Sequence, residues 1–191
     1  MIEIDLIKRC QQGDEDSFEQ LYKIYATKAF RTAYLFVNKR DIAEDILQET
    51  FLECYRDINR LHKPESFETW FYRILVRISW RLAAKERKAL HENLDDCAEF
   101  LKDDQNIFES IETDTKTGMI REIINCLKDP IRTTIILYYY NDISIKGIAK
   151  IMNCLQGTVK SRLFNGRKII SKEIENRQPD FSIDYLTVKG V

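Results

Sequence analysis

A short stretch near the end of the chain concentrates side chains that can recognise a nucleic acid. Residues 142–163 predict two helices joined by a turn, because Ser144 suits an N-cap and Asn153 tolerates the left-handed conformation that ends a helix. The second helix is expected to start near Leu155 or Gln156. Its predicted buried stripe comprises Val159, Leu163 and Ile170. This pattern is typical of a helix-turn-helix.

The exposed face of that second helix combines cationic groups with hydrogen-bonding groups. Arg and Lys neutralise phosphates, whereas Arg, Asn and Gln can also make paired hydrogen bonds to base edges. Because a recognition helix presents its N-terminal residues to the bases, we expect base contacts from Gln156, Thr158, Ser161 and Arg162. We expect phosphate contacts from Lys160, Arg167 and Lys168, with Asn165 on the same face. A solvated basic face on an ordinary helix pair is the alternative interpretation.

A second cationic face is predicted on a helix from about Ser66 or Phe67 to Lys88. At about 100° per residue, the basic residues Arg73, Arg77, Arg81 and Lys88 fall within roughly a quarter turn. Such a stripe suits a single-stranded nucleic acid, because cations follow the backbone and a flat aromatic ring stacks on an unpaired base. The predicted set is Trp70, Arg73, Arg77, Trp80 and Arg81. The alternative, that the tryptophans are core residues, is about equally good for Trp80 and harder to sustain for Trp70.

An acidic face is predicted on the helix from Asp41 to about Asn59. Asp41 and Glu44 have the spacing of a capping box, so we expect the helix to open at Asp41. Positions 45, 48 and 49 share one side, because residues three and four apart are neighbours on a helix. The polar set on this helix is Asp41, Glu44, Asp45, Gln48 and Glu49. From the residues alone, a solvated acidic face is the favoured interpretation.

The remaining pattern predicts two helical domains and a linker. Before residue 41 we expect one helix starting near Asp16 or Ser17 and another over Ala29–Val37. Residues 61–66 interrupt the pattern, since Pro64 disfavours helix at the preceding residue. Residues 91–118 lose periodicity and are expected to form a linker with one short helix near 107–111, and helices return over 119–178. The tail, residues 179–191, is too short to fold alone.

Charge is distributed unevenly, although the formal net charge of the chain is −1. Residues 1–90 hold 16 Lys and Arg against 15 Asp and Glu, and residues 91–118 hold 2 against 9. Residues 119–191 hold 12 against 7. The basic final third suits a nucleic-acid partner, whereas a duplex would repel the acidic linker.

The sequence gives little support to catalysis, metal binding or membrane insertion. The five cysteines are scattered without a Cys-x-x-Cys pair, so we expect no disulfide framework and no metal site. There is no Gly-rich phosphate loop, and His62 and His91 lack an obvious acid or nucleophile partner. We therefore predict no catalytic residue, no cofactor and no enzyme. No stretch approaches the roughly 20 apolar residues that span a bilayer, and we expect a cytoplasmic protein.

Three segments of the sequence resemble the same protein family. Gly157–Leu163, which reads GTVKSRL, is similar to the recognition helix in region 4 of the ECF (extracytoplasmic-function) sigma factors, and residues 127–144 resemble the helices and turn before it. Asp45–Phe51, which reads DILQETF, resembles region 2.2 of the same family. The resemblance extends over residues 14–178 and keeps the family's order. The sequence departs from the family pattern at Leu155, at residues 146–147 and at residues 164–166, where Gly166 is expected to cost about 1 kcal/mol relative to Ala.

The resemblance implies an all-α protein: a four-helix region-2 domain over 1–90, a flexible acidic linker over 91–118, and a region-4 helix-turn-helix domain over 119–178. It implies that region 4 binds the −35 promoter element, and that the helix 67–88 with the preceding loop, residues 61–66, melts and reads the −10 element. It also implies docking on the β′ clamp coiled coil and the β flap of RNA polymerase. The implied partners are core polymerase, promoter DNA and an anti-sigma factor, often membrane-bound; outside such complexes a monomer is expected.

The runner-up hypothesis is a helix-turn-helix repressor or activator with an N-terminal helical sensor domain. Such a regulator would dimerise and read a palindrome without polymerase. The acidic face from Asp45 to Glu49 and the basic stripe from Trp70 to Arg81 argue against it, because a stand-alone regulator requires neither.

Overall fold

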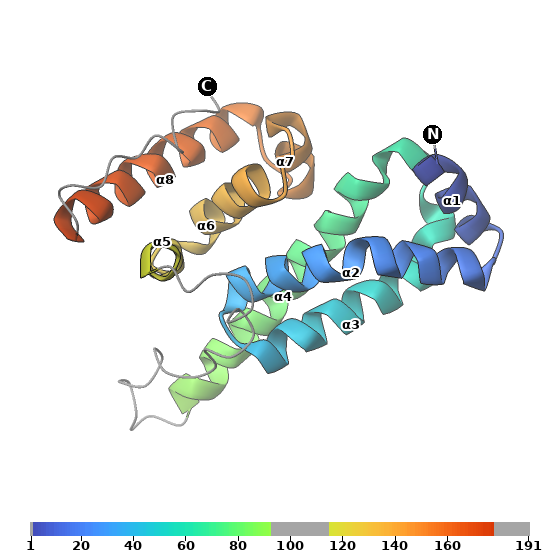
Figure 1. Ribbon diagram of the computed structural model, residues 1–191, viewed down its shortest axis with the longest axis horizontal. Helices are drawn as coiled ribbons and strands as arrows, with labels where there is room; N and C mark the ends of the chain where they lie inside the picture. The colour runs from blue at the N-terminus through green and yellow to red at the C-terminus, as the bar shows by residue number, and fades with distance from the viewer. Residues whose placement is uncertain (1, 93–114, 178–191) are drawn as a thin grey trace. The chain divides into compact units, whose positions relative to one another are not determined.

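The computed structural model describes residues 2–92 and 115–177, which form two compact helical units. The first unit contains four α-helices and two short 3-10 turns (Figure 1). Their bounds are α1 Ile2–Gln11, α2 Glu15–Val37, α3 Arg40–Asp57, η1 Ile58–Arg60, η2 Pro64–Ser66 and α4 Phe67–Glu92. No strand occurs in either described stretch, which confirms the all-helical prediction.

Helices α2, α3 and α4 pack against one another, and α1 packs along α2. Phe71 lies at the centre of this core, with its ring centroid 5.2 Å from those of both Tyr25 and Phe51. Ala29 and Ala33 on α2 and Ala43 on α3 are fully buried. Because these side chains are small, the helix backbones can approach closely while the aromatic rings fill the remaining space.

The N-terminal half of this unit differs from the sequence prediction in two respects. Helix α1 was not predicted, and the two helices expected between residues 16 and 37 are one continuous helix, α2. No Gly or Pro interrupts residues 15–37, so nothing in the backbone ends the helix there. Its predicted end is confirmed: Asn38 adopts the left-handed conformation with φ 53°, and its N–H donates to the carbonyl of Tyr34 at 2.7 Å.

The capping box predicted at Asp41 is also wrong. Helix α3 begins at Arg40, with Lys39 as an N-cap that makes no side-chain capping bond, so Asp41 lies inside the first turn. A carboxylate there still interacts favourably with the positive end of the helix dipole. The local spacing therefore identified the helix and missed its cap. Helix α4 starts at Phe67 as predicted and extends to Glu92.

The second unit comprises α5 Thr115–Asn125, α6 Asp129–Ile135, the π-helical segment η3 Ile136–Tyr140, α7 Ile145–Ile151 and α8 Gln156–Arg177. Helix α8 packs against α5, α6 and α7. Its buried residues are Val159, Leu163, Gly166, Ile170 and Ile174, which confirms the predicted stripe. Helix α5 begins at Thr115, three residues before the predicted end of the linker. The short helix expected near 107–111 falls outside the described residues.

Candidate nucleic-acid interface

The α7–α8 pair has the turn chemistry that the sequence predicted. The Ser144 hydroxyl oxygen accepts a hydrogen bond from the Gly147 N–H at 3.1 Å and so caps α7. Asn153 adopts φ 47° after the end of α7, and the N–H of Cys154 donates to the carbonyl of Ala149 at 3.0 Å. These contacts end α7 and direct the chain into α8 at Gln156, one of the two predicted starts.

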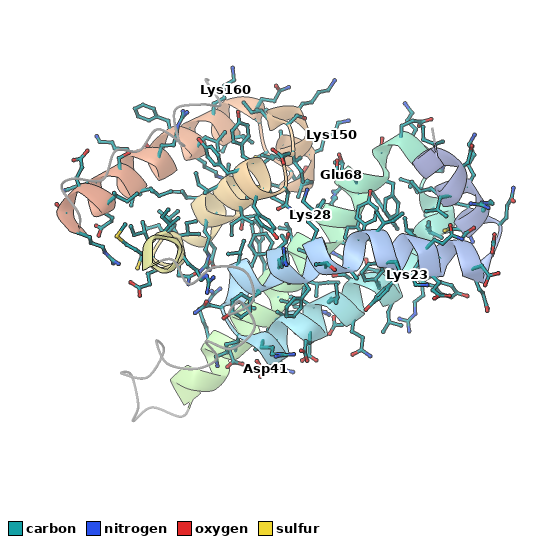
Figure 2. All side chains as sticks on the ribbon, viewed as in Figure 1. Lys23, Lys28, Asp41, Glu68, Lys150 and Lys160 are labelled. Atoms are coloured by element: carbon teal, nitrogen blue, oxygen red, sulfur yellow. The ribbon has the colours of Figure 1, made fainter. Side chains whose placement is uncertain are left out.

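None of the eight predicted DNA-contacting side chains on α8 is fully buried. Thr158, Arg162 and Arg167 are half-buried, and the exposed ones are Gln156, Lys160, Ser161, Asn165 and Lys168. In Figure 2, Lys160 of α8 and the exposed Lys150 of α7 project from the surface of this unit. From Gln156 to Lys172 the helix contains no acidic residue. The exposed face of α8 is therefore uniformly cationic or neutral over most of its length.

Arg162 is held at the turn by two sulfur atoms. Its Nη1 lies 3.8 Å from Met152 Sδ and 3.8 Å from Cys154 Sγ. The Met152 sulfur lies 3.3 Å from the hydroxyl oxygen of Thr134 on α6, and that hydroxyl donates to the carbonyl of Pro130 at 2.7 Å. The guanidinium therefore starts from a restricted position beside the turn. Sequence spacing gave no indication of these contacts.

The basic stripe predicted on α4 lies at the surface. Arg73, Arg77 and Arg81 are exposed, and Trp80 is exposed rather than core. Trp70 is half-buried, with its ring centroid 5.9 Å from that of Phe67. Trp70 thus contacts Phe67 and is also partly open to solvent.

Two arginines of this stripe form ion pairs with acids on α3. Arg77 pairs with Glu53, and Arg81 pairs with Glu49. Arg73 has no acidic partner within the described ranges. The predicted cationic stripe and the predicted acidic face therefore adjoin one another, which helical periodicity within each separate helix could not indicate.

The acidic face itself is solvated along most of α3. Asp41, Glu44, Asp45 and Gln48 are exposed, and Glu49 is half-buried. Glu44 forms an i,i+4 ion pair with Arg40 at 2.8 Å. Exposed pairs of this kind contribute little to stability, so the acidic side chains are available to a partner.

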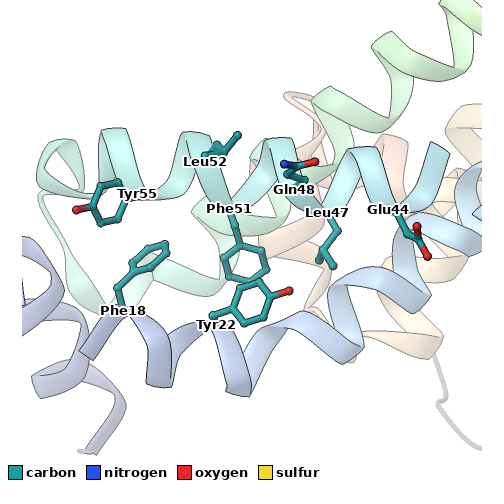
Figure 3. A pocket seen from close by; sticks show the side chains of 8 residues that line it. All are labelled: Phe18, Tyr22, Glu44, Leu47, Gln48, Phe51, Leu52 and Tyr55. Carbon is teal, nitrogen blue, oxygen red and sulfur yellow. The ribbon is translucent and has the colours of Figure 1, made fainter. Parts of the chain in front are cut away.

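Beside this face, an apolar groove of about 490 Å³ lies between α2 and α3 (Figure 3). Its walls are Phe18, Tyr22, Glu44, Leu47, Gln48, Phe51, Leu52 and Tyr55. Tyr22, Leu52 and Tyr55 are 43%, 47% and 50% exposed. Sequence analysis identified Glu44 and Gln48 but missed the exposed aromatic residues beside them. Their helical spacing was compatible with burial, and only the packing leaves them uncovered.

The loop between α3 and α4 is anchored by its apolar residues. Leu61 and Phe67 are buried, whereas His62 and Lys63 between them are exposed. The Ser66 N–H donates to the carbonyl of Lys63 at 2.8 Å, which forms the turn η2 ahead of α4. The loop therefore presents a short polar tip at the N-terminal end of the basic stripe.

Metal sites, disulfides and membrane-spanning helices were the remaining features expected to be absent. In the part of the chain that it describes, no three His, Cys, Asp or Glu side chains are grouped so as to hold a metal ion. The four cysteines described are free thiols, and burial raises the pKa of the Cys54 thiol, with a smaller contribution from Cys10. Among the described helices, none has the length and apolarity needed to cross a membrane.

Comparison with known proteins identifies both units. Residues 21–89 match the family Sigma-70 region 2, and residues 117–170 match the family Sigma-70, region 4. The ECF RNA polymerase sigma-E factor of Haemophilus influenzae is 30% identical over 178 residues, which cover 89% of this chain and 94% of the relative. The chain belongs to the ECF sigma factors. It is thus a non-enzymatic RNA polymerase sigma factor that acts in transcription initiation.

Further relatives agree with this assignment. The ECF sigma factor SigW of Bacillus subtilis is 28% identical to this sigma factor, with 89% of this chain and 95% of the relative covered. Among solved structures, CnrH in complex with the cytosolic domain of CnrY matches with TM-score 0.69 and 17% identity, covering 91% of this chain and 97% of that one. The Bartonella quintana sigma factor RpoE, in complex with the anti-sigma factor NepR, matches with TM-score 0.68 and 19% identity, covering 83% and 96%. These two structures support the fold.

Proposed function

We propose that this sigma factor reads the −35 element with α8, and reads and melts the −10 element with α4 and the loop before it. The −35 assignment depends on one observation: α8 has no acidic residue from Gln156 to Lys172. This helix follows α7, which Ser144 caps. Half-buried Arg162 and exposed Gln156 and Ser161 are suited to base edges, and the lysines are suited to phosphates.

For the −10 element, the stripe on α4 provides cations beside partly exposed tryptophans. Arg73 is already available to a phosphate, whereas Arg77 and Arg81 must exchange Glu53 and Glu49 for the DNA backbone. Such an exchange is inexpensive, because exposed ion pairs typically contribute less than about 1 kcal/mol. A base released from the duplex can stack on Trp70 or Trp80.

Core polymerase is proposed to dock on α3. The exposed acids Asp41, Glu44 and Asp45 and the adjoining groove together offer charge and apolar area to the β′ coiled coil. The second unit is assigned to the β flap. An apolar centre within a polar rim is the usual anatomy of a protein interface.

We assign residues 1–90 to region 2, residues 91–118 to the linker and residues 119–178 to region 4, with no role given to residues 179–191. An anti-sigma factor, in some cases membrane-bound, is proposed as a further partner, as the solved relative with NepR illustrates. Outside these complexes the protein is expected to be a monomer. It is expected in the cytoplasm, where bacterial RNA polymerase acts.

Transcription in vitro tests the proposal. Core polymerase is assayed with and without the protein on a pooled genomic promoter library, and transcript starts are mapped. New starts that share paired upstream and downstream motifs are expected, and Asp45→Arg with Glu49→Arg should abolish them. The Arg162→Ala variant should relax the upstream motif and leave the downstream motif unchanged. No core binding, together with binding to a duplex palindrome, would instead support a stand-alone regulator.

A further inference from the structure

Helix α1 lies against the loop that precedes α4. It contacts α2 and both short turns, η1 and η2, which flank residues 61–63. Leu6, Ile7 and Cys10 of α1 are buried in this packing. In Figure 1, α1 lies beside the start of α4. A helix that sequence analysis did not predict thus supports the loop from the side opposite its exposed tip.

One side chain joins α1 to the loop by hydrogen bonds. The Gln11 amide Nε2 donates to the carbonyl of Ile58 at 3.0 Å and to the carbonyl of Leu61 at 2.7 Å. The loop's own backbone supplies few bonds here: the Leu61 N–H donates to the Ile58 carbonyl at 3.1 Å. Both carbonyl groups therefore depend on Gln11 for part of their hydrogen bonding.

These bonds fix the direction in which the loop leaves η1. Holding the Leu61 carbonyl sets the peptide plane between Leu61 and His62, and the buried Leu61 side chain prevents that plane from rotating freely. His62 and Lys63 are exposed immediately after it. Gln11, which is 50 positions before Leu61 in the chain, therefore helps to fix the backbone from which these two side chains project.

We propose that Gln11 is a positioning residue for base selection at the −10 element. The proposal rests on the proposed function, in which the loop 61–66 reads that element. Gln11 itself lies behind the loop and acts on the DNA only through the backbone of Leu61. Two neutral hydrogen bonds determine the size of the effect, and we expect their loss to reduce discrimination among bases by about three- to tenfold.

The test uses full-length protein in reconstituted polymerase holoenzyme, on templates with a fixed −35 element and randomised −10 bases. Gln11→Leu removes the amide with an apolar side chain that is one atom shorter, and Gln12→Leu is the matched control, because the neighbouring Gln12 side chain is exposed. Gln11→Leu should flatten the −10 base preference about three- to tenfold, with polymerase affinity and −35 preference within about twofold of wild type. Gln12→Leu should retain the wild-type preference.

Base preference is a ratio between templates, so it does not depend on the fraction of folded protein. Should Gln11→Leu form no holoenzyme, Gln11→Met replaces it, because Met keeps an unbranched chain of the same length. A purely structural role predicts equal loss on all templates, and that result would overturn the proposal.

A third variant separates this inference from the function on which it rests. His62→Ala with Lys63→Ala alters the loop tip directly. A flattened preference in this variant, with a normal preference in Gln11→Leu, would refute the role of Gln11 and leave the loop's function standing. A normal preference in both variants would refute the reading of −10 bases by the loop itself.

Discussion

Replacing Gly166 with Ala tests the packing of the second unit, because sequence and structure predict opposite signs. In an ordinary helix interior, Gly to Ala is stabilising by about 1 kcal/mol. In this structure Gly166 is buried against α6, and an added Cβ would lie 2.8 Å from both Cδ1 and Cγ1 of Ile135 and 3.0 Å from Cγ2 of Ile131. Glycine is therefore needed here for close helix approach.

The size of the effect follows from these contacts. Ordinary contacts between carbon atoms lie at about 3.5–4.0 Å, so the neighbours must move by several tenths of an ångström or more. Ile135 is 3% exposed and β-branched, which leaves it little room to change rotamer. Overpacking of this kind costs about 1–3 kcal/mol. After subtraction of the helix-propensity gain, we expect Gly166→Ala to destabilise the second unit by about 1 kcal/mol, and by no more than about 2.

Hydrogen exchange in the full-length protein measures this change. The slowest backbone amides of α6 and α8 report the free energy of opening of the unit. Both tryptophans lie on α4 in the other unit, so tryptophan fluorescence during unfolding should be unaffected. Gly157→Ala is the matched control: it lies in the same helix, has no atom within 4 Å of a built Cβ, and should be neutral or stabilising.

Stabilisation by about 1 kcal/mol in Gly166→Ala would refute the close approach of α6 and α8. The same substitution made in an Ile135→Ala protein gives a second test. Ile135→Ala removes both atoms at 2.8 Å, so in that background the cost of Gly166→Ala should shrink or change sign. An unchanged cost would show that Ile135 is not the obstacle.

Three further predictions concern caps and ion pairs. Ser144→Ala should destabilise α7 by about 1 kcal/mol through loss of its N-cap, measured by amide exchange in α7. The hydroxyl and N–H of Ser17 donate to the Asp14 carboxylate and lower its pKa below the ordinary value of 3.8, so this carboxylate stabilises the fold above pH 3.8. That contribution should vanish as pH falls through the lowered pKa, and the stability difference between wild type and Asp14→Ala, followed by tryptophan fluorescence, should vanish with it. A double-mutant cycle on Glu49 and Arg81 should give a coupling below about 1 kcal/mol that decreases with salt, because the Arg81 and Glu49 side chains are 61% and 43% exposed.

Local signals in the sequence were sufficient for several elements. Ser144 and Asn153 predicted both ends of α7, because capping and left-handed turns depend on the side chain and backbone of single residues. The buried stripe of α8 followed from helical period alone. Pro64 predicted the break before α4 for the same local reason.

Helix α1 shows why other elements escaped prediction. At 10 residues it is too short to be stable alone, and its stability comes from burying Leu6, Ile7 and Cys10 against the rest of the unit. The opposite error occurred at Asp41, where a suitable local spacing was overridden by a helix that begins one residue earlier.

For the candidate surfaces too, some features could be predicted from the sequence and others depended on the tertiary structure. The sequence by itself determined which side chains occupy each helix face, and therefore the acid-free face of α8 and the family to which the chain belongs. Only the tertiary structure decided that Arg81 pairs with Glu49, that Gly166 packs closely against Ile135, and that Gln11 donates a hydrogen bond to Leu61. The physical reason is the distance along the chain. A helix period relates residues three or four positions apart, whereas these contacts join residues more than 30 positions apart. The packing of whole helices sets the distances between such residues.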